Sequence, residues 1–578
     1  MLSQSEKPLS HAVRKDSMPN TSTSLIAFCR KHEWALVGYV AATAFVLGLI
    51  GLHRHQQFDQ TVWSWPDAIY FALRLFTFEL DLSNSDTDPY VFDDGNWPLH
   101  VARFLAPATL AFAVVKGVML AGASKLNIWR ISRLKGHAVI CGAGERGRQL
   151  ALALRSEGRD VVVIEKDEDC DTLADIRAAG ARTVIGGITD PARQGEARFD
   201  TASIVVAVTP CVESNLQAVL AASRRTNELP VRALAYAPRS FAAMFENQPP
   251  FARIDSGREC GFFDHETAAA RLLVGRYAVD LAGMLLREKR QPRILVVGDG
   301  NLIPKLLGVL VTQCQYAEAG LPGVELLTVD EDAVAREFPL NHPQMSLVAD
   351  LHVRQLSLPQ LLRVELRGTG PQAALSPYDL AFVACREDAD TLSLATNLAQ
   401  QHGCITGNVV AGLQPSTQLM RLFTVDRPLP GVDLHDLVAL GCSADIVLHG
   451  RLDDIARSIH ESYLQGQLKA GRMKSETPAL VPWEDLPDGL RQANRAQADH
   501  IPIKRRTLEV SKSEATIEAL AEAEHRRWTA EKIVAGWRHA ATRDDGKRLH
   551  PSIRPYSELS VAEKNKDRDT VVAVASTS

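Results

Sequence analysis

A glycine-rich turn stands between a short apolar run, His137 to Cys141, and an amphipathic stretch that has helical spacing. Glycines in the spacing GxGxxG allow a tight turn, the close approach of a pyrophosphate and close packing of helix on strand. The next apolar run ends in an acid 18 residues past the last glycine, placed to accept hydrogen bonds from ribose hydroxyls and to disfavour a 2′-phosphate. The pattern predicts a nucleotide site, or a Rossmann fold that has lost its ligand. Its candidate residues are Gly142, Gly144, Glu145, Arg146, Gly147 and Glu165.

The elements that must position this turn alternate between strand and helix. Apolar runs at 160–165, 182–188 and 202–208 predict further strands, and a helix is expected at about 215–225. Such alternation is typical of a parallel sheet covered by helices. We therefore expect a Rossmann-type domain over residues 136–255, followed by a linker helix over 256–290.

A second run of the same kind begins at Arg293, and Gly298-Asp299-Gly300 follows it. The next strand again ends in an acid, Asp330, which indicates an internal duplication over residues 291–450. Ile303 replaces the third glycine, and the Asp299 carboxylate would repel a pyrophosphate. We expect this degenerate copy to serve structure or assembly, with nucleotide binding as the alternative.

Two long apolar segments precede these domains. Residues 34–52 carry no charge, and residues 104–124 carry only Lys116. Nineteen residues form about 28 Å of helix, close to the hydrocarbon thickness of a bilayer. Two spans within residues 34–124 are expected, although a buried soluble helix would have the same pattern. Basic residues flank the outer ends and acids fill the intervening loop, so residues 1–33 and the chain beyond 125 are expected in the cytoplasm.

The segment between the spans, residues 65–81, resembles the pore-helix region of two-transmembrane potassium channels, with Asp67-Ala68-Ile69-Tyr70-Phe71 matching its opening. A re-entrant helix is expected at 65–78. The family's TVGYG filter is replaced by FTFEL, without glycine, so potassium selectivity is not implied. A carboxylate-lined pore, a non-conducting anchor and a solvated acidic loop remain open, and Lys116 facing a pore would repel cations. The pore candidates are Thr77, Phe78, Glu79 and Asp81.

Together with the glycine turn and Glu165, a Rossmann unit placed directly after two spans resembles the RCK or KTN (TrkA-N type) domains of potassium channels and transporters. This resemblance implies NAD(H), ADP, ATP or a related nucleotide as ligand. No hydride-transfer residues accompany the motif, so the nucleotide is expected to act as an effector.

The C-terminal region, residues 452–578, resembles the RyR repeat, a small helical module of ryanodine receptors and bacterial proteins. The matching positions are His525, Trp528, Lys532, Gly536, Trp537, Arg543, Asp544, Lys547, Leu549, His550, Pro551, Pro555, Tyr556, Leu559, Lys564, Asp567 and Arg568. Five residues on its loops form either a pocket for an anionic ligand or a solvated basic turn. They are Arg543, Lys547, His550, Arg554 and Tyr556. We expect His460 and His500 to pack between helices rather than bind metal.

Composition excludes several classes. The net charge of −5 gives no reason to expect nucleic-acid binding, and the nine cysteines include no CxxC pair. GxSxG, HExxH and Walker motifs are missing, so no catalytic or metal-ligating residue is predicted.

The predicted fold class is a membrane α-helical module (two spans plus a re-entrant helix), then tandem α/β Rossmann-like RCK domains and a small α-helical RyR domain. The predicted function is a ligand-gated ion channel or channel-like protein, in which the RCK and RyR modules sense a nucleotide. We expect a homo-oligomer, a tetramer, in a bacterial inner membrane. Alternatives are a non-conducting nucleotide sensor or membrane-disrupting stress or defence effector, and, more remotely, a membrane-bound NAD-consuming enzyme or oxidoreductase.

Overall fold

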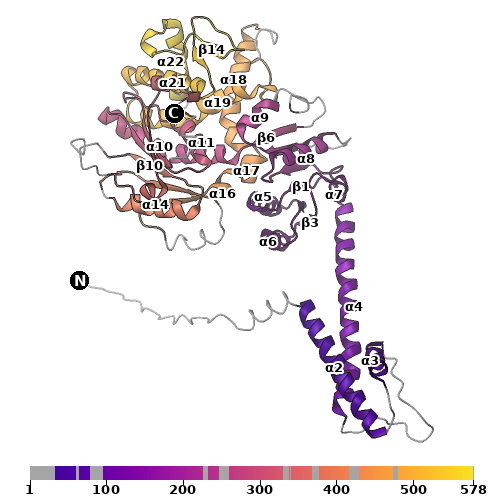
Figure 1. Ribbon diagram of the computed structural model, residues 1–578. Coiled ribbons are helices and arrows are strands. Elements are labelled where there is room, and N and C mark those ends of the chain that lie inside the picture. The colour runs from indigo at the N-terminus through magenta and orange to yellow at the C-terminus, as the bar shows by residue number, and fades with distance from the viewer. Residues whose placement is uncertain are drawn as a thin grey trace, which may run out of the picture. The chain divides into compact units, whose positions relative to one another are not determined.

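The computed structural model divides into two compact units, Met1–Trp129 and Arg130–Ser578, which are described separately (Figure 1). It describes residues 33–59, 64–77, 96–224, 232–245, 251, 259–329, 338, 340–366, 377–401, 403–414, 428–472 and 479–576. Three pore candidates, Phe78, Glu79 and Asp81, lie outside these residues.

The first unit contains helix α2 (Glu33–Asp59), helix α3 (Trp65–Arg74) with a 3-10 turn η1 (Leu75–Thr77), and most of helix α4 (Trp97–Ser132). Its buried core consists mainly of small residues. A Cβ added to Gly51 would lie 2.7 Å from the backbone nitrogen of Leu99, so glycine lets α2 touch the start of α4. The side-chain amide of Asn96 donates to the Gly51 carbonyl over 2.9 Å, which closes this contact with a hydrogen bond.

Two stretches of these helices are long and apolar enough to cross a membrane, judged by length and composition alone. They are Trp34–Arg54, with mean hydropathy 2.2, and Trp97–Met119, with mean hydropathy 1.5. Only 22% of each stretch is buried, whereas the core helix of a soluble protein is mostly buried. The second stretch starts seven residues before the predicted 104–124, because α4 begins at Trp97.

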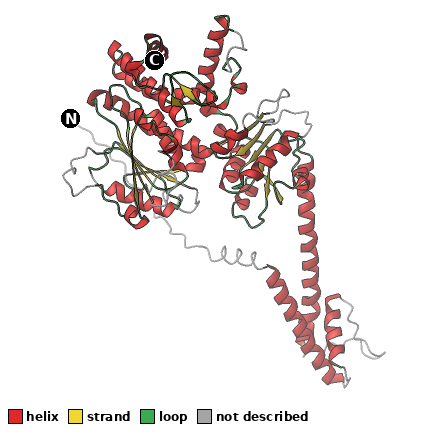
Figure 2. Ribbon diagram, turned by 45° about the horizontal axis from the view of Figure 1, so that its top comes forward, coloured by secondary structure: helices red, strands yellow, loops and turns green. Residues whose placement is uncertain are grey.

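The first lobe (residues 138–263) is a six-stranded parallel sheet in the order β3-β2-β1-β4-β5-β6. Its strands are β1 (Ala138–Cys141), β2 (Val161–Glu165), β3 (Arg182–Ile185), β4 (Ile204–Ala207), β5 (Arg232–Tyr236) and β6 (Glu259–Phe263). Its helices are α5 (Glu145–Ser156), α6 (Thr172–Ala178), α7 (Pro191–Glu196), α8 (Val212–Arg224) and α9 (Arg239–Phe245). Helices cover both faces of the sheet (Figure 2).

The first lobe extends past the predicted boundary at residue 255. Residues 259–263, expected within a linker helix, pair in parallel with β5 as the edge strand β6. Aromatic residues favour strands, and Phe262 stacks on Phe251 with ring centroids 4.5 Å apart. The linker helix is the shorter α10 (His265–Glu288), which begins where Asp264 accepts hydrogen bonds from the amides of Glu266 and Thr267.

The second lobe (residues 293–436) repeats this topology. Counted from β7, its order β12-β11-β10-β7-β8-β9 is the strand order of the first sheet, which confirms the predicted duplication of the fold. Its strands are β7 (Arg293–Val297), β8 (Gly323–Val329), β9 (Asp350–Leu356), β10 (Leu380–Val383), β11 (Val409–Leu413) and β12 (Val432–Asp436). Its helices include α11 (Leu302–Gln313), α13 (Leu358–Leu362) and α14 (Asp388–Gln400).

Two short helices that follow the second sheet pack on the first lobe. They are α16 (Leu437–Gly441) and α17 (Ala444–Val447). Their buried side chains, Val438, Cys442 and Val447 among them, share one core with Leu150 and Leu154 of α5. Helix α5, which follows the glycine turn, therefore packs against residues that follow the second sheet in the chain.

The C-terminal module (residues 451–576) is mainly helical. Its helices are α18 (Asp454–Lys469), α19 (Asp488–Asp499), α20 (Ile501–Val510), α21 (Glu514–Val534) and α22 (Val561–Ser576). The module also contains the 3-10 turns η3 (Arg451–Asp453), η4 (Trp483–Asp485) and η5 (Tyr556–Glu558). Two short strands, β13 (Arg538–His539) and β14 (Leu549–His550), complete it. Ile503, Ala530 and Ile533 belong to the same hydrophobic core as Leu306 and Leu310 of α11. The module and the second lobe thus form one packed body.

Candidate functional site

The glycine turn lies at the carboxyl end of β1, the central strand of the first sheet. Gly142 has a φ of +109°, in the region that favours glycine, and its amide donates to the Ile164 carbonyl over 2.8 Å. A Cβ at Gly147 would lie 1.9 Å from the Gly142 carbonyl oxygen, so α5 can begin against the turn only with glycine there. Strand order reverses between β1 and β4, which is where open α/β sheets bind ligands.

Gly144 has a different role from the other two glycines. It is the N-cap of α5, and nothing lies within 4 Å of the position that its Cβ would occupy. Space is therefore open beside the start of α5, where the first amides of a helix have no partner within the helix and can bind a phosphate.

Glu165 ends β2 beside this turn. One carboxylate oxygen accepts a hydrogen bond from the Ala143 amide over 2.6 Å, and the other accepts from the amides of Lys166 and Asp167 over 2.7 and 3.0 Å. The structure thus brings Glu165 together with the glycine turn, as the spacing predicts. Three backbone amides thus fix the carboxylate beside the glycine turn.

The other two candidates point elsewhere. Glu145 pairs with Arg148, with Oε2 and Nε 2.8 Å apart. The Arg146 guanidinium carbon lies 3.8 Å from the ring centroid of Tyr236, and its Nη1 donates to the Val208 carbonyl over 3.3 Å. In this structure, Arg146 therefore belongs to a contact with β5 rather than to the open phosphate position.

Several residues that sequence reasoning missed hold the site. Asn215, fully buried in α8, donates to the carbonyls of Thr209 and Tyr236 and accepts from the Thr209 amide, which fixes the loop after β4. Thr172 donates to the Ala143 carbonyl from the start of α6. A single asparagine or threonine within a helix carries no local sequence signal for such a role.

Asp264, His265 and Glu266 offer ligand atoms within 4.8 Å of one another, a spacing that could hold a metal ion. However, Asp264 caps α10 and lies 3.2 Å from Lys305 Nζ of α11, and Arg146 also acts on the cluster. Because Lys305 pairs with Asp264 and Arg146 interacts electrostatically with Glu266, we interpret this group as an ion network.

The second copy of the turn is closed. A Cβ at Gly300, the counterpart of Gly144, would lie 3.0 Å from the carbonyl oxygens of Ala384 and Cys385, and the Asp299 carboxylate accepts from the Arg386 amide over 3.1 Å. Ile303 is fully buried in the core. Backbone atoms and the Asp299 carboxylate thus crowd the turn of the second lobe, whereas the position beside Gly144 of the first lobe is open.

Of the pore candidates, only Thr77 lies within the described residues. It is the last residue of η1, and its hydroxyl donates to the Arg74 carbonyl over 3.1 Å. Residues 65–77 are helical, close to the predicted 65–78. The Lys116 ammonium group lies 5.5 Å from the Trp34 ring and 5.8 Å from the Phe112 ring, so its charge is placed over aromatic faces.

The five RyR candidates do not leave a free group of cations. The closest atoms are 2.6 Å apart in Arg543–Asp545, 3.5 Å in Lys547–Asp544 and 3.7 Å in Arg554–Glu563. The Tyr556 hydroxyl donates to Glu518, and His550 Nδ1 accepts from the Ser552 amide. This pairing favours the solvated basic turn over an anion pocket.

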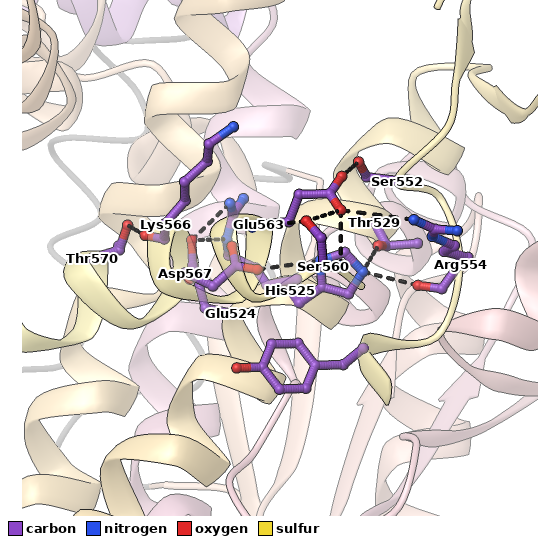
Figure 3. A network of polar contacts seen from close by, with 12 residues as sticks. Glu524, His525, Thr529, Ser552, Arg554, Ser560, Glu563, Lys566, Asp567 and Thr570 are labelled. Atoms are coloured by element: carbon purple, nitrogen blue, oxygen red, sulfur yellow. Dashed lines mark hydrogen bonds and ion pairs between the residues drawn. The ribbon is translucent and has the colours of Figure 1, made fainter. Parts of the chain in front are cut away.

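A buried histidine of α21 contacts both the loop before η5 and helix α22 of the C-terminal module. His525 Nε2 lies 2.9 Å from the Arg554 carbonyl oxygen, and Nδ1 lies 3.3 Å from Asp567 of α22 (Figure 3). Glu563 accepts hydrogen bonds from Ser552 and Ser560 in the same network (Figure 3). His460 and His500, expected to pack between helices, are likewise buried against the carbonyl oxygens of Val481 and Gln315.

Comparison with protein families identifies two segments. Residues 138–247 match the TrkA-N domain, and residues 500–577 match the RyR domain. The resemblances that the glycine turn and the C-terminal motif imply are thus confirmed for these segments. Comparison with curated proteins finds no match.

Comparison with solved structures finds matches of low sequence identity and low TM-score. One, described as GsuK bound to ADP, is 15% identical, covers 75% of this chain and 100% of its own, and has a TM-score of 0.38. Another, a GsuK channel bound to NAD, is 14% identical, covers 74% of this chain and 85% of its own, and has a TM-score of 0.37. Likenesses this low carry no ligand or activity to this chain.

Proposed function

We propose that the first lobe is a regulatory nucleotide site and that the ligand is NAD(H) or an adenine nucleotide. The open space at Gly144, at the start of α5 and beside the fixed Glu165 carboxylate, carries this proposal. The ligand acts as an effector, because no acid, base or nucleophile of the described residues is placed for a reaction at this turn.

We further propose that this site gates a pore or pore-like module in a bacterial inner membrane. The two apolar stretches and the helix between them support a membrane module, in a homo-oligomer because one two-span chain cannot enclose a pore. The last turn of α4 places Ile131 in the core of the first lobe, beside Val139 and Val162. Ligand-dependent movement of that lobe would therefore act on the helix that carries the second stretch.

Replacing Gly144 with Asp is expected to weaken nucleotide binding at least tenfold while leaving the fold intact. The new side chain meets no protein atom, but it puts a negative charge where the phosphates bind. Isothermal titration of the detergent-solubilised protein with NAD⁺, NADH, ADP and ATP measures the change.

Gly144→Ala is the matched control, because it adds a Cβ to the same open position without charge, and it should weaken binding less than Gly144→Asp does. Gly147→Ala should instead destabilise the lobe, since its Cβ would meet the Gly142 carbonyl oxygen. Unchanged affinity in Gly144→Asp would place the ligand elsewhere.

Conduction requires a separate test. Single-channel recording in bilayers, with and without each nucleotide, should show ligand-dependent currents, and Glu79→Gln should change ion preference if carboxylates line the pore. Silence under every ligand would favour the alternative of a non-conducting, membrane-tethered nucleotide sensor or effector.

A further inference from the structure

Arg146 joins the nucleotide turn to the start of α10. It is the second residue of α5, yet its guanidinium group lies on the face of Tyr236, 3.8 Å from the ring centroid. The Tyr236 hydroxyl donates to Glu266 Oε2 over 3.3 Å. Arg146, in the first turn of α5, thus lies on the ring of Tyr236, and Tyr236 in turn forms a hydrogen bond with the Glu266 carboxylate of α10.

Glu266 depends on Arg146 for its charge balance. It is 5% exposed, and the titratable and charged groups that face it are Asp264 and His265 of its own helix start, Arg146 of α5, Tyr236 of β5 and Lys305 of α11. Burial and the neighbouring Asp264 raise the pKa of Glu266 to about 7, while Arg146 and Lys305 act in the opposite direction. Without Arg146, two carboxylates would face one lysine.

We propose that the nucleotide phosphates and the Tyr236–Glu266 pair compete for the guanidinium group of Arg146. This inference rests on the proposed nucleotide site. Arg146 lies in the first turn of α5, where the helix amides bind phosphate, and guanidinium groups bind phosphate and carboxylate through the same planar geometry. Binding of the nucleotide would draw Arg146 from Tyr236 towards the phosphates.

The contact that loses Arg146 is also where the second lobe packs. Asp264 lies 3.2 Å from Lys305 Nζ, and a Cβ at Gly441 of α16 would lie 2.0 Å from the His265 carbonyl oxygen. Further along α10, Arg271 binds Asp499 of the C-terminal module, with Nε and Oδ2 2.7 Å apart. Competition for Arg146 would therefore couple nucleotide affinity to the packing of α10. Nucleotide binding would change how α10 packs, and a change in the packing of α10 would change nucleotide affinity by the same free energy.

Titration calorimetry of the full-length protein with ADP tests the competition. Glu266→Gln keeps the shape of the side chain but removes the negative charge that attracts Arg146, so at about pH 8, where most Glu266 carboxylates are ionised, ADP should bind about three- to tenfold more tightly. Tyr236→Phe keeps the ring and removes the hydroxyl, so the gain should be smaller. Arg146→Gln should weaken binding about tenfold, and the double variant Arg146→Gln/Glu266→Gln should bind like Arg146→Gln alone.

Glu213→Gln is the control, because it removes one exposed carboxylate from the first turn of α8 in the same lobe. Suppose that the wild type binds ADP. If Glu266→Gln then changes ADP affinity no more than Glu213→Gln does, or if the effects of Arg146→Gln and Glu266→Gln add in the double variant, the competition is wrong and the nucleotide site stands. If the wild type binds none of the nucleotides, the proposed function fails, and the inference fails with it.

Discussion

Glu524→Gln is expected to lower the free energy of unfolding of the C-terminal module and its packed partner by about 3–5 kcal/mol. Glu524 lies at the centre of a buried group of charges. Lys504 Nζ lies 2.6 Å and Arg527 Nη2 2.9 Å from its carboxylate, and all three residues are 3% exposed or less. A neutral amide would leave two buried cations without their shared partner, and this is the costly way to break such a group.

The direction in which the pKa of Glu524 is shifted supports its place at the centre of this group of charges. Burial alone would raise the pKa of Glu524, but the charges of Arg527 and Lys504 outweigh burial and hold its pKa well below the ordinary value. The carboxylate therefore stays ionised in the folded protein. His500, also fully buried, lies 3.6 Å from the same carboxylate and contacts the Gln315 carbonyl oxygen, so the loss should extend to the contact with the second lobe.

Lys504→Met should cost much less than Glu524→Gln, because Glu524 keeps Arg527 and the methionine fills an apolar volume. Glu522→Gln, an exposed carboxylate on the same helix, is the control and should change stability by less than about 0.5 kcal/mol. Chemical denaturation measures the free energy of unfolding of each variant, and hydrogen exchange of the α20 and α21 amides then shows whether the loss lies in these helices. Equal losses in Glu524→Gln and Lys504→Met would contradict the central role of Glu524.

The sequence predicts those parts of the first lobe that local patterns determine. Gly142, Gly147 and Glu165 could be placed because turn geometry and strand ends impose a fixed spacing on the residues. The duplication was also predictable, since the second copy keeps the apolar runs and part of the glycine turn. Asp299 and Ile303 mark where this copy departs from the glycine motif.

Long-range contacts escaped prediction. Arg146 was assigned to the ligand because it lies in the motif, but its side chain turns to Tyr236, 90 residues further along the chain. The strand at 259–263 was placed in a linker, since a five-residue run beside a helix has little periodicity to distinguish it. The packing of α16 and α17 on α5 depends on tertiary contacts that no local pattern records.

The C-terminal module shows a third limit. The pattern predicts its helices and the burial of His500, but for the charged loop residues it allows both an anion pocket and a solvated turn. Deciding between these required the partners of each cation, namely Asp545, Asp544 and Glu563. Acids and bases close in sequence do not reveal whether they pair with each other or with a ligand.

Glu266→Gln is also expected to stabilise the protein at alkaline pH by up to about 3 kcal/mol relative to the wild type, and to have little effect near pH 4.5. Burial and Asp264 raise the pKa of Glu266 from 4.5 in the unfolded chain to about 7 in the folded protein. Between these values the folded protein holds a proton that the unfolded chain has released, so wild-type stability falls as pH rises. Each pH unit of this interval is worth about 1.4 kcal/mol.

The neighbouring His265 gives this prediction a second signature. Burial is the main cause that lowers the pKa of His265 from 6.5 to about 4, and the charge of Arg146 lowers it further. Between these two pH values the unfolded chain binds a proton that the folded protein excludes. From pH 4.5 to 6.5 the two effects oppose each other in the wild type, because both states carry one proton on the pair. Glu266→Gln leaves only the histidine effect, so the variant should lose stability as pH falls below 6.5 while the contribution of the pair in the wild type stays level.

Thermal and urea unfolding of both proteins from pH 4.5 to 8 measures the difference directly, since the other titrating groups cancel between them. Glu288→Gln, an exposed carboxylate at the far end of α10, is the control for removing one negative charge and should change stability little. A difference between Glu266→Gln and the wild type that does not change with pH would mean that Glu266 is ionised throughout. In that case the cluster at the start of α10 would not respond to protons.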